Sequence, residues 1–207
     1  MNKPNQINWN NNSQVPTYEG IQSTSQQRFQ EKILFAYPIY VFENVALSNK
    51  QEHLKLFYNL KKEHPVAAER SNQGGWQSFW NMHGNPMMNS LVFLIESACK
   101  EVFGVSCKIE DAWVNISGKN HFNAIHNHGG GPAGPFPKHI SGVYYYKVPN
   151  NDSPLIFHQP SDFNNVQRHA PHEDQLIIFD PCLYHSVHPN NTDQDRISIA
   201  FNAETYL

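Results

Sequence analysis

The pattern of apolar and polar residues divides the chain into a polar start, two helical segments and a series of short strands. Residues 1–30 are rich in Asn, Gln and Ser. They offer too little apolar surface to offset the entropy of ordering, so we expect a flexible arm there. Residues 33–45 are rich in β-branched and aromatic side chains and predict a strand, whose proline favours the edge of a sheet.

Two amphipathic helices are predicted next. The first runs from a cap at Ser48 to about Lys62, with apolar residues at roughly helical spacing. The second begins at Asn85, because Pro86 fits the first turn of a helix, and it ends at Gly104.

After these helices the pattern changes to short apolar runs separated by Gly, Pro and Asn. Such runs predict strands, and about seven of them predict a sandwich or barrel. They span residues 105–117, 121–127, 140–148, 154–158, 175–180, 182–188 and 196–202. Residues 129–138 and 159–174 between them are predicted to be loops, and long loops on a β scaffold often carry function. We therefore expect a mainly β fold with helices near its N-terminus.

The composition of the chain limits the classes of partner and compartment that we expect for it. A chain of 207 residues fits one domain, expected over residues 31–207, with enough core to need no disulfides. Three cysteines without metal-type spacing favour a reducing, cytoplasmic setting, and no stretch predicts a signal peptide or a membrane span. A net charge of −3 without a Lys/Arg cluster argues against nucleic-acid and membrane partners. A small molecule or a protein side chain is left as the expected substrate, and a homo-oligomer is left open.

The histidines indicate where the chemistry lies, because nine of the twelve fall between residues 121 and 188. His126 and His128 follow a predicted strand, in which residues two apart project to the same face and can converge on one ion. His185 follows the apolar run QLIIFDPCLY and can supply a third ligand. Imidazole suits several transition metals, so the ligand type alone does not choose the ion. A His-x-His pair by itself is as consistent with an ordinary polar loop.

Arg196 lies eleven positions after His185, across a turn-forming stretch and at the start of a predicted strand. Ser198 follows two residues later and therefore faces the same side. A guanidinium offers paired donors that match a carboxylate, and a serine hydroxyl can add another hydrogen bond. The pair predicts a carboxylate-binding site. The alternative is a surface arginine paired with Asp193 or Asp195.

In this order, the motifs resemble the 2-oxoglutarate and Fe(II)-dependent oxygenase superfamily. The matching features are a strand, HNH where the pattern usually has His-x-acid, the segment SGVYY, a distal histidine and Arg-x-Ser. The segments AWVNISG, SGVYYYKVP, LIFHQP, LYHSVHPN and RISIAFN more narrowly resemble an oxygenase family of marine bacteria and their phages. The resemblance covers residues 111–202, and the segment LFAYPIYVF more loosely.

The resemblance implies a double-stranded β-helix, a jelly-roll-like barrel of the cupin type, with metal ligands on its second and seventh core strands. By position it makes His126 the first iron ligand, His128 the ligand in the usual carboxylate place and His185 the distal ligand. Arg196 and Ser198 take the place of the pair that binds the far carboxylate of 2-oxoglutarate.

Three more residues are assigned by the resemblance alone. Tyr145 corresponds to a tyrosine that often bonds the same carboxylate, although a plain core tyrosine is as consistent with its place. Asn115 and Asn202 fall on pocket-facing positions and are assigned to the 2-oxoglutarate site. The usual superfamily ligand set is two histidines and a carboxylate, so a histidine at position 128 is a departure from the pattern.

These assignments predict an Fe(II)- and 2-oxoglutarate-dependent dioxygenase whose usual outcome would be hydroxylation. One alternative is a three-histidine, cupin-like dioxygenase without 2-oxoglutarate, which would leave Arg196 and Ser198 without a role. Another is a non-enzymatic β-sandwich binding or viral structural module with incidental histidines. The prime substrate is not identified. Four residues are candidates for lining its site, although such residues more often serve packing: Trp76, Trp80, His139 and His158.

Overall fold

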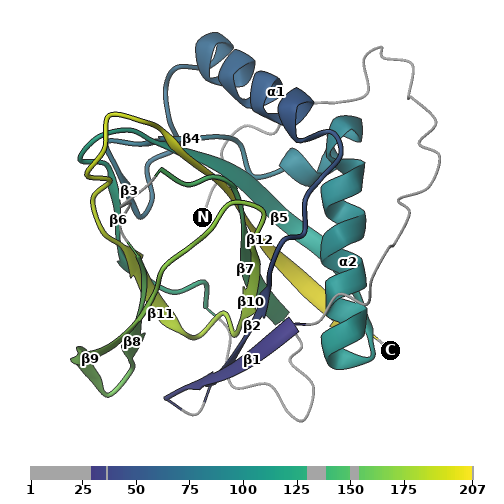
Figure 1. Cartoon of the computed structure of the whole chain (residues 1–207), viewed down its shortest axis with the longest axis vertical. Coiled ribbons are helices and arrows are strands. Elements are labelled where there is room, and N and C mark those ends of the chain that lie inside the picture. Colours follow the sequence, from purple (N-terminus) through teal and green to yellow (C-terminus); the bar gives the residue numbers. More distant parts are fainter. Residues whose placement is uncertain (1–28, 36, 130–138, 150–153, 207) are drawn as a thin grey trace.

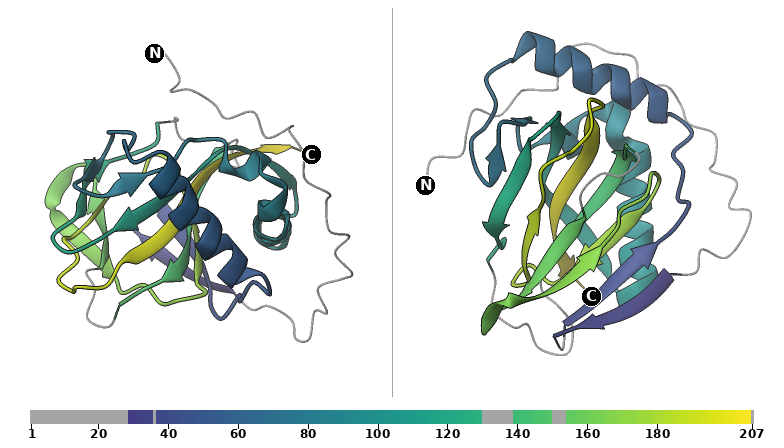
Figure 2. Two further views of the ribbon diagram at one scale, coloured as in Figure 1. Left: turned by 90° about the horizontal axis from the view of Figure 1, so that it is seen from above. Right: turned by 60° about the vertical axis from the view of Figure 1, so that its left-hand side comes forward.

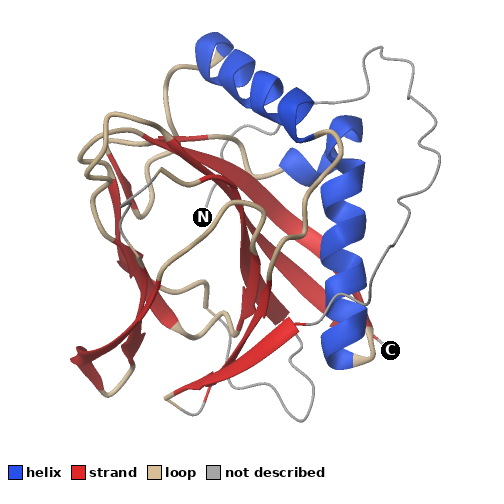
Figure 3. Cartoon of the chain, viewed as in Figure 1, coloured by secondary structure: helices blue, strands red, loops and turns tan. Residues whose placement is uncertain are grey.

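The computed structural model describes residues 29–35, 37–129, 139–149 and 154–206, and its strands and helices are shown in Figures 1 and 3. Positions 1–28 of the predicted arm lie outside the described residues. Most of the predicted loop 129–138 also lies outside them. Two β-sheets make up most of the described chain, and its two α-helices follow early strands, as the sequence predicted.

The larger sheet has seven strands in the order β1-β2-β10-β7-β12-β5-β4. They are β1 (Phe29–Leu34), β2 (Tyr37–Phe42), β10 (Leu176–Phe179), β7 (His139–Lys147), β12 (Arg196–Tyr206), β5 (Ser106–Ser117) and β4 (Trp76–Gln77). The smaller sheet has five, in the order β3-β6-β11-β8-β9. They are β3 (Asn72–Gln73), β6 (Phe122–His126), β11 (Tyr184–Val187), β8 (Leu155–Gln159) and β9 (Asp162–His169). The described strand pairs are antiparallel.

The two sheets face each other (Figure 2), and apolar side chains from both belong to one buried cluster. Val143 and Ile177 of the larger sheet belong to the same buried cluster as Leu155 and Phe157 of the smaller one. The arrangement is the double-stranded β-helix that was predicted.

The helices cover the outer face of the larger sheet (Figure 1). They are α1 (Lys50–Glu63) and α2 (Asn89–Phe103), with two 3-10 turns before α2, η1 (Met82–Gly84) and η2 (Pro86–Met88). Phe57 of α1 and Ile95 of α2 belong to the same buried cluster as Tyr144 and Phe201 of the sheet. No helix in the described part of the chain is long and apolar enough to cross a membrane.

The single strand predicted over residues 33–45 is wrong, because the chain turns within it. The turn passes through Phe35, which has a φ of +53°, and β1 and β2 form an antiparallel hairpin around it. β1 is the edge strand, whereas β2 pairs on both sides. Pro38 is tolerated in β2 because it lies beyond Ile39–Phe42, the stretch that pairs with β10.

The helix starts also differ from prediction. Ser48 is not the cap of α1, since Asn49 precedes its first residue and makes no side-chain capping bond. Asn85 does act as a cap, but of the turn η2, where its side chain accepts a hydrogen bond from the backbone N–H of Met87, and α2 follows. Gly104 ends α2 in the left-handed conformation, with a φ of +68°, as predicted.

The seven predicted strands are confirmed within a few residues at each end, but the predicted loop 159–174 contains β9. β9 is a mostly exposed outer strand with the sequence DFNNVQRH, so it shows no alternation of apolar and polar residues. Such a strand is held by backbone pairing with β8 and leaves little trace in the hydrophobic pattern. The two-residue strands β3 and β4 were missed for lack of length.

Candidate metal centre

Two strands of the smaller sheet bring two of the predicted metal histidines together. His126, the last residue of β6, is paired directly with His185 of β11. The next pair is Asn123 with Val187, so two residues of β6 lie opposite one residue of β11. This β-bulge turns both His126 and Asn123 inward, where strict alternation would place them on opposite faces.

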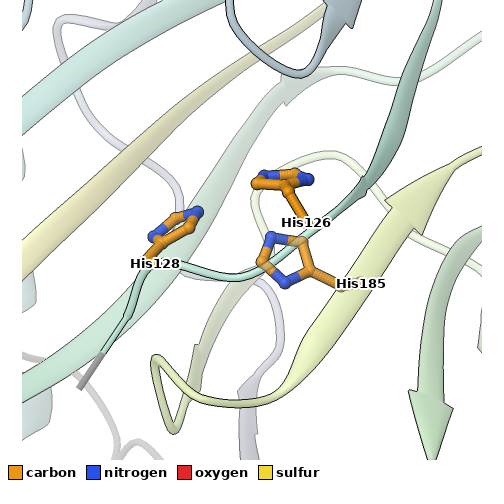
Figure 4. A group of neighbouring side chains, drawn as sticks. All are labelled: His126, His128 and His185. Carbon is orange, nitrogen blue, oxygen red and sulfur yellow. The ribbon is translucent and has the colours of Figure 1, made fainter. Parts of the chain in front are cut away.

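His128 lies two residues beyond the end of β6, and the predicted strand 121–127 also ended before it. Its backbone N–H donates to the carbonyl of Pro181, 2.9 Å away, which holds this turn of the chain against the loop before β11. One candidate ligand atom from each of His126, His128 and His185 can be chosen so that all three lie within 4.8 Å of one another. Figure 4 shows the three rings converging from β11 and from the end of β6. The predicted facial set of imidazoles is therefore assembled.

Each ring has its Nδ1 atom next to an oxygen acceptor. The distances are 2.9 Å from His126 to the carbonyl of Ala124 and 2.9 Å from His185 to the carbonyl of Leu183. His128 Nδ1 lies 2.6 Å from Oδ1 of Asn202. A carbonyl oxygen can only accept, so Nδ1 carries the proton and the lone pair is at Nε2. The donor set fits a transition metal, because metal-binding histidines usually donate their other N–H in this way.

Burial keeps the three imidazoles neutral. It lowers the pKa of His126, lowers that of His128 to about 4, and lowers that of His185 well below its usual value. Desolvation of the charged form is the largest cause in each case, and the neighbouring histidines add repulsion at His128 and His185. At neutral pH all three lone pairs are available to an ion.

A ladder of facing residues on β12 and β5 forms the opposite wall. On both strands alternate residues pack under the helices, so the residues between them face inward. From the deep end to the mouth, the inward pairs are Arg196 with Ser117, Ser198 with Asn115, Ala200 with Trp113, and Asn202 with Asp111. On β7, Tyr145 pairs with Ser198 and Ser141 with Asn202.

An inner pocket connects this ladder to the histidines. Its lining includes all three histidines together with four predicted residues: Arg196, Ser198, Tyr145 and Asn115. Arg196 is 3% exposed, so it is not the surface arginine of the alternative interpretation. The buried Oδ1 of Asn115 has no hydrogen-bond partner among the described residues, which leaves a polar atom for a bound molecule or water to satisfy.

An outer cleft of about 540 Å³ opens on the other side of two of the histidines. It shares Ser71, Trp113, His126 and His128 with the inner pocket. Its other lining residues include Arg70, Gln77, Trp80, Asp111 and Asn202. The candidate metal site therefore lies at the junction of two cavities, one lined by Arg196 and the other open to a second molecule.

Comparison with known proteins finds a family that part of the chain resembles. Residues 111–202 match the model of a family described as "Putative 2OG-Fe(II) oxygenase". This segment contains the three histidines and the whole inward ladder. Over these residues the chain is similar to that family. No curated protein matches the sequence.

The chain shares its fold with solved structures at low sequence identity. HygX from Streptomyces hygroscopicus, solved with nickel, 2-oxoglutarate and hygromycin B, is 11% identical with a TM-score of 0.61, covering 80% of this chain and 82% of that one. A prolyl hydroxylase from Trichoplax adhaerens, in complex with a hypoxia inducible factor peptide, is 16% identical (TM-score 0.59; 80% and 83%). A prolyl-4-hydroxylase from Pseudomonas putida is 10% identical (TM-score 0.57; 82% and 93%).

Of the four candidate substrate-lining residues, only Trp80 lines the outer cleft. Trp76 is buried under α1 and donates to the carbonyl of His64. His158 lies 2.8 Å from the hydroxyl of Ser186, and His139 lies 3.8 Å from Glu110. Neither histidine lines the inner pocket or the outer cleft.

Sequence reasoning missed two lining residues of the outer cleft and one residue beside the histidines. Trp113 and Asp111 share the inward face of β5 with Asn115, so the alternation within DAWVNISG could have indicated them. Ser141 lines neither cavity but lies beside His128, and the alternation in β7 places it on the same face as Tyr145. Its hydroxyl lies 3.0 Å from His128 Nδ1 and donates to Asn202 Oδ1 at 2.8 Å. No sequence signal indicated Arg70, which lies between α1 and β3.

Proposed function

We propose that the protein is an Fe(II)- and 2-oxoglutarate-dependent oxygenase, in which His126, His128 and His185 hold the Fe(II) ion. Arg196 and Ser198 bind the far carboxylate of 2-oxoglutarate in the inner pocket. The convergence of three neutral imidazoles on a pocket that also contains a buried arginine is the observation that carries the proposal. The bound metal and co-substrate together supply the oxidising chemistry.

The chain's own residues would bind and orient the co-substrate. A guanidinium at the deep end of a narrow pocket gives a dicarboxylate one direction, because its planar donors match a carboxylate. The hydroxyl of Ser198 and the side chain of Tyr145, its neighbour on β7, are next to the same carboxylate position. The 2-oxo acid end of the co-substrate is thereby directed toward the histidines. The buried Arg196 also favours a 2-oxoglutarate-dependent enzyme over a three-histidine dioxygenase without 2-oxoglutarate.

The position of Asn202 suggests a role different from the predicted contact with 2-oxoglutarate. Asn202 lines the outer cleft and accepts from the Nδ1 atom of His128, while Ser141 donates to the same oxygen. We propose that Asn202 orients His128. A histidine at the usual carboxylate position leaves the metal charge uncompensated, and the dianion of 2-oxoglutarate would compensate for it.

We further propose that the substrate occupies the outer cleft and is hydroxylated there. Neighbours of the same fold were solved with a small molecule in one case and with a peptide in another. A small molecule and a protein side chain therefore both remain proposed substrate classes. We also propose a single oxygenase domain over residues 31–207, a cytoplasmic location and an origin in marine bacteria or phages. The three cysteines are free, which fits a reducing compartment.

Metal stoichiometry and turnover test the proposal together. The purified protein should bind one Fe(II) and convert 2-oxoglutarate to succinate with O₂ when a substrate is supplied. Replacing His126 or His185 with alanine should abolish both. His139→Ala is the matched control, because His139 lies in neither cavity. Full metal binding in His185→Ala, with an intact fold, would contradict the assignment.

A further inference from the structure

The outer cleft has a cation of its own, separate from Arg196. The guanidinium carbon of Arg70 lies 5.0 Å from the centre of the Trp80 ring. Stacking holds the plane of the guanidinium while its N–H edges stay available. Among the described residues the Arg70 side chain donates one hydrogen bond, 3.3 Å long, to the carbonyl of Glu69, and it forms no ion pair. Arg70 is solvent-exposed, so its remaining donors can reach a ligand.

The cleft also contains one acidic side chain. Asp111 lies on the inward face of β5, opposite Asn202. The charged lining residues are therefore one arginine and one aspartate apart from the histidines. Such a lining favours a ligand with a single carboxylate and a hydrogen-bond donor, and it disfavours a polyanion such as a nucleotide.

Apolar surface lies between these charges and the metal centre. The Trp80 and Trp113 rings are 6.3 Å apart with planes tilted by 42°, and the Trp113 ring is 5.5 Å from that of His128. A hydrocarbon group that packed against Trp113 would lie beside the metal histidines. Ile125, 48% exposed at the same cleft, adds to this apolar surface.

We propose that the outer cleft binds an amino-acid-like monocarboxylate as the substrate. Its carboxylate pairs with Arg70, its N–H group donates to Asp111, and its apolar side chain packs against Trp113 next to the metal. The cleft volume of about 540 Å³ suits such a molecule. A free amino acid and the C-terminal residue of a peptide share this chemistry. The assignment of this ligand as substrate rests on the proposed function.

The test uses the protein loaded anaerobically with Fe(II) and saturating 2-oxoglutarate. It is titrated with the common L-amino acids, with their C-terminal amides, and with glycyl dipeptides that end in the same residues. Quenching of tryptophan fluorescence reports binding, and succinate formation after O₂ is admitted reports turnover. We expect at least one acid to bind and to stimulate turnover, with its amide at least about tenfold weaker, because a charge-assisted hydrogen bond is lost. The dipeptides show whether the free acid or the peptide end is preferred.

Arg70→Gln should weaken the binding of that acid about 10- to 100-fold and leave the weak binding of its amide unchanged. Arg70→Lys should restore part of the affinity. The matched control is Arg168→Gln, since Arg168 is an exposed arginine on β9 outside the cleft. Equal binding of acid and amide, an unaltered affinity in Arg70→Gln, or no acid that binds would overturn the proposal. The titration is repeated on metal-free protein, so failure of metal binding would count against the proposed function alone.

Discussion

The inner pocket and the outer cleft share two histidines but are built differently. The predicted residues of the inner pocket lie on strands or at a strand end, and their directions follow from the alternation of side chains along β5, β7 and β12. The distinctive side chains of the outer cleft include Arg70 and Trp80, which lie on the connection between α1 and α2. The proposed co-substrate site is therefore fixed by the scaffold, while the proposed substrate site depends on segments that can vary without disturbing the barrel.

The largest expected effect is a loss of stability at acid pH, which follows from the burial of the imidazoles. The pKa of His128 is about 4 in the folded protein, against about 6.5 for an ordinary histidine. Between these values the unfolded chain binds more protons, so the free energy of unfolding of the metal-free protein should decrease as pH falls from about 6.5 to about 4. His128 alone corresponds to a loss of roughly 3 kcal/mol. Denaturant unfolding of the parent and of His128→Gln at several pH values checks this. An equal loss in both would contradict it.

The next effect separates the two arginines. Arg196→Lys keeps the charge but loses the planar pair of donors, so affinity for 2-oxoglutarate should fall by about 1.5–3 kcal/mol. Arg70→Gln, in the outer cleft, should leave that affinity unchanged. Calorimetric titration of 2-oxoglutarate into both metal-loaded variants measures the difference. Comparable losses in the two variants would mean that the co-substrate occupies both cavities.

The smallest expected effect tests how His128 is oriented where the two cavities meet. Asn202→Ala removes the acceptor for His128 Nδ1 and should weaken Fe(II) binding about 10- to 100-fold, as is usual for partners of metal-binding histidines. Asn127→Ala is the control, since Asn127 also lines the outer cleft but no hydrogen bond joins it to the three histidines. Competition with a chelator gives both affinities. Unchanged binding in Asn202→Ala would mean that His128 is oriented by other contacts.

Much of the inner pocket could be predicted because its residues occur in short motifs with a period of two. Arg196 and Ser198 were placed on one face by that period, and the structure has them there. The order of the motifs supplied what spacing cannot, namely that His185 lies beside His126. The fold class followed from the run of short apolar strands after Gly104, and the comparison with known folds confirms it.

The rest depends on tertiary structure. The bulge that turns His126 inward needs the pairing of β6 with β11, and neither strand alone predicts it. β9 has no hydrophobic pattern, because it is exposed along most of its length. Arg70 meets Trp80 only because the connection after α1 folds over the sheet edge, and a single arginine in a polar segment carries no signal.

The central claim is that three histidines form the metal site beside a 2-oxoglutarate pocket. Anaerobic titration with Fe(II) and 2-oxoglutarate, followed by the visible charge-transfer absorption of the chelate, tests it most directly. The parent should develop this absorption at one equivalent of iron. His128→Asp should retain it, because a carboxylate can coordinate from the same position, and His128→Ala should lose most of it. If His128→Ala titrates like the parent, the three-histidine site is wrong and only His126 and His185 remain as ligands.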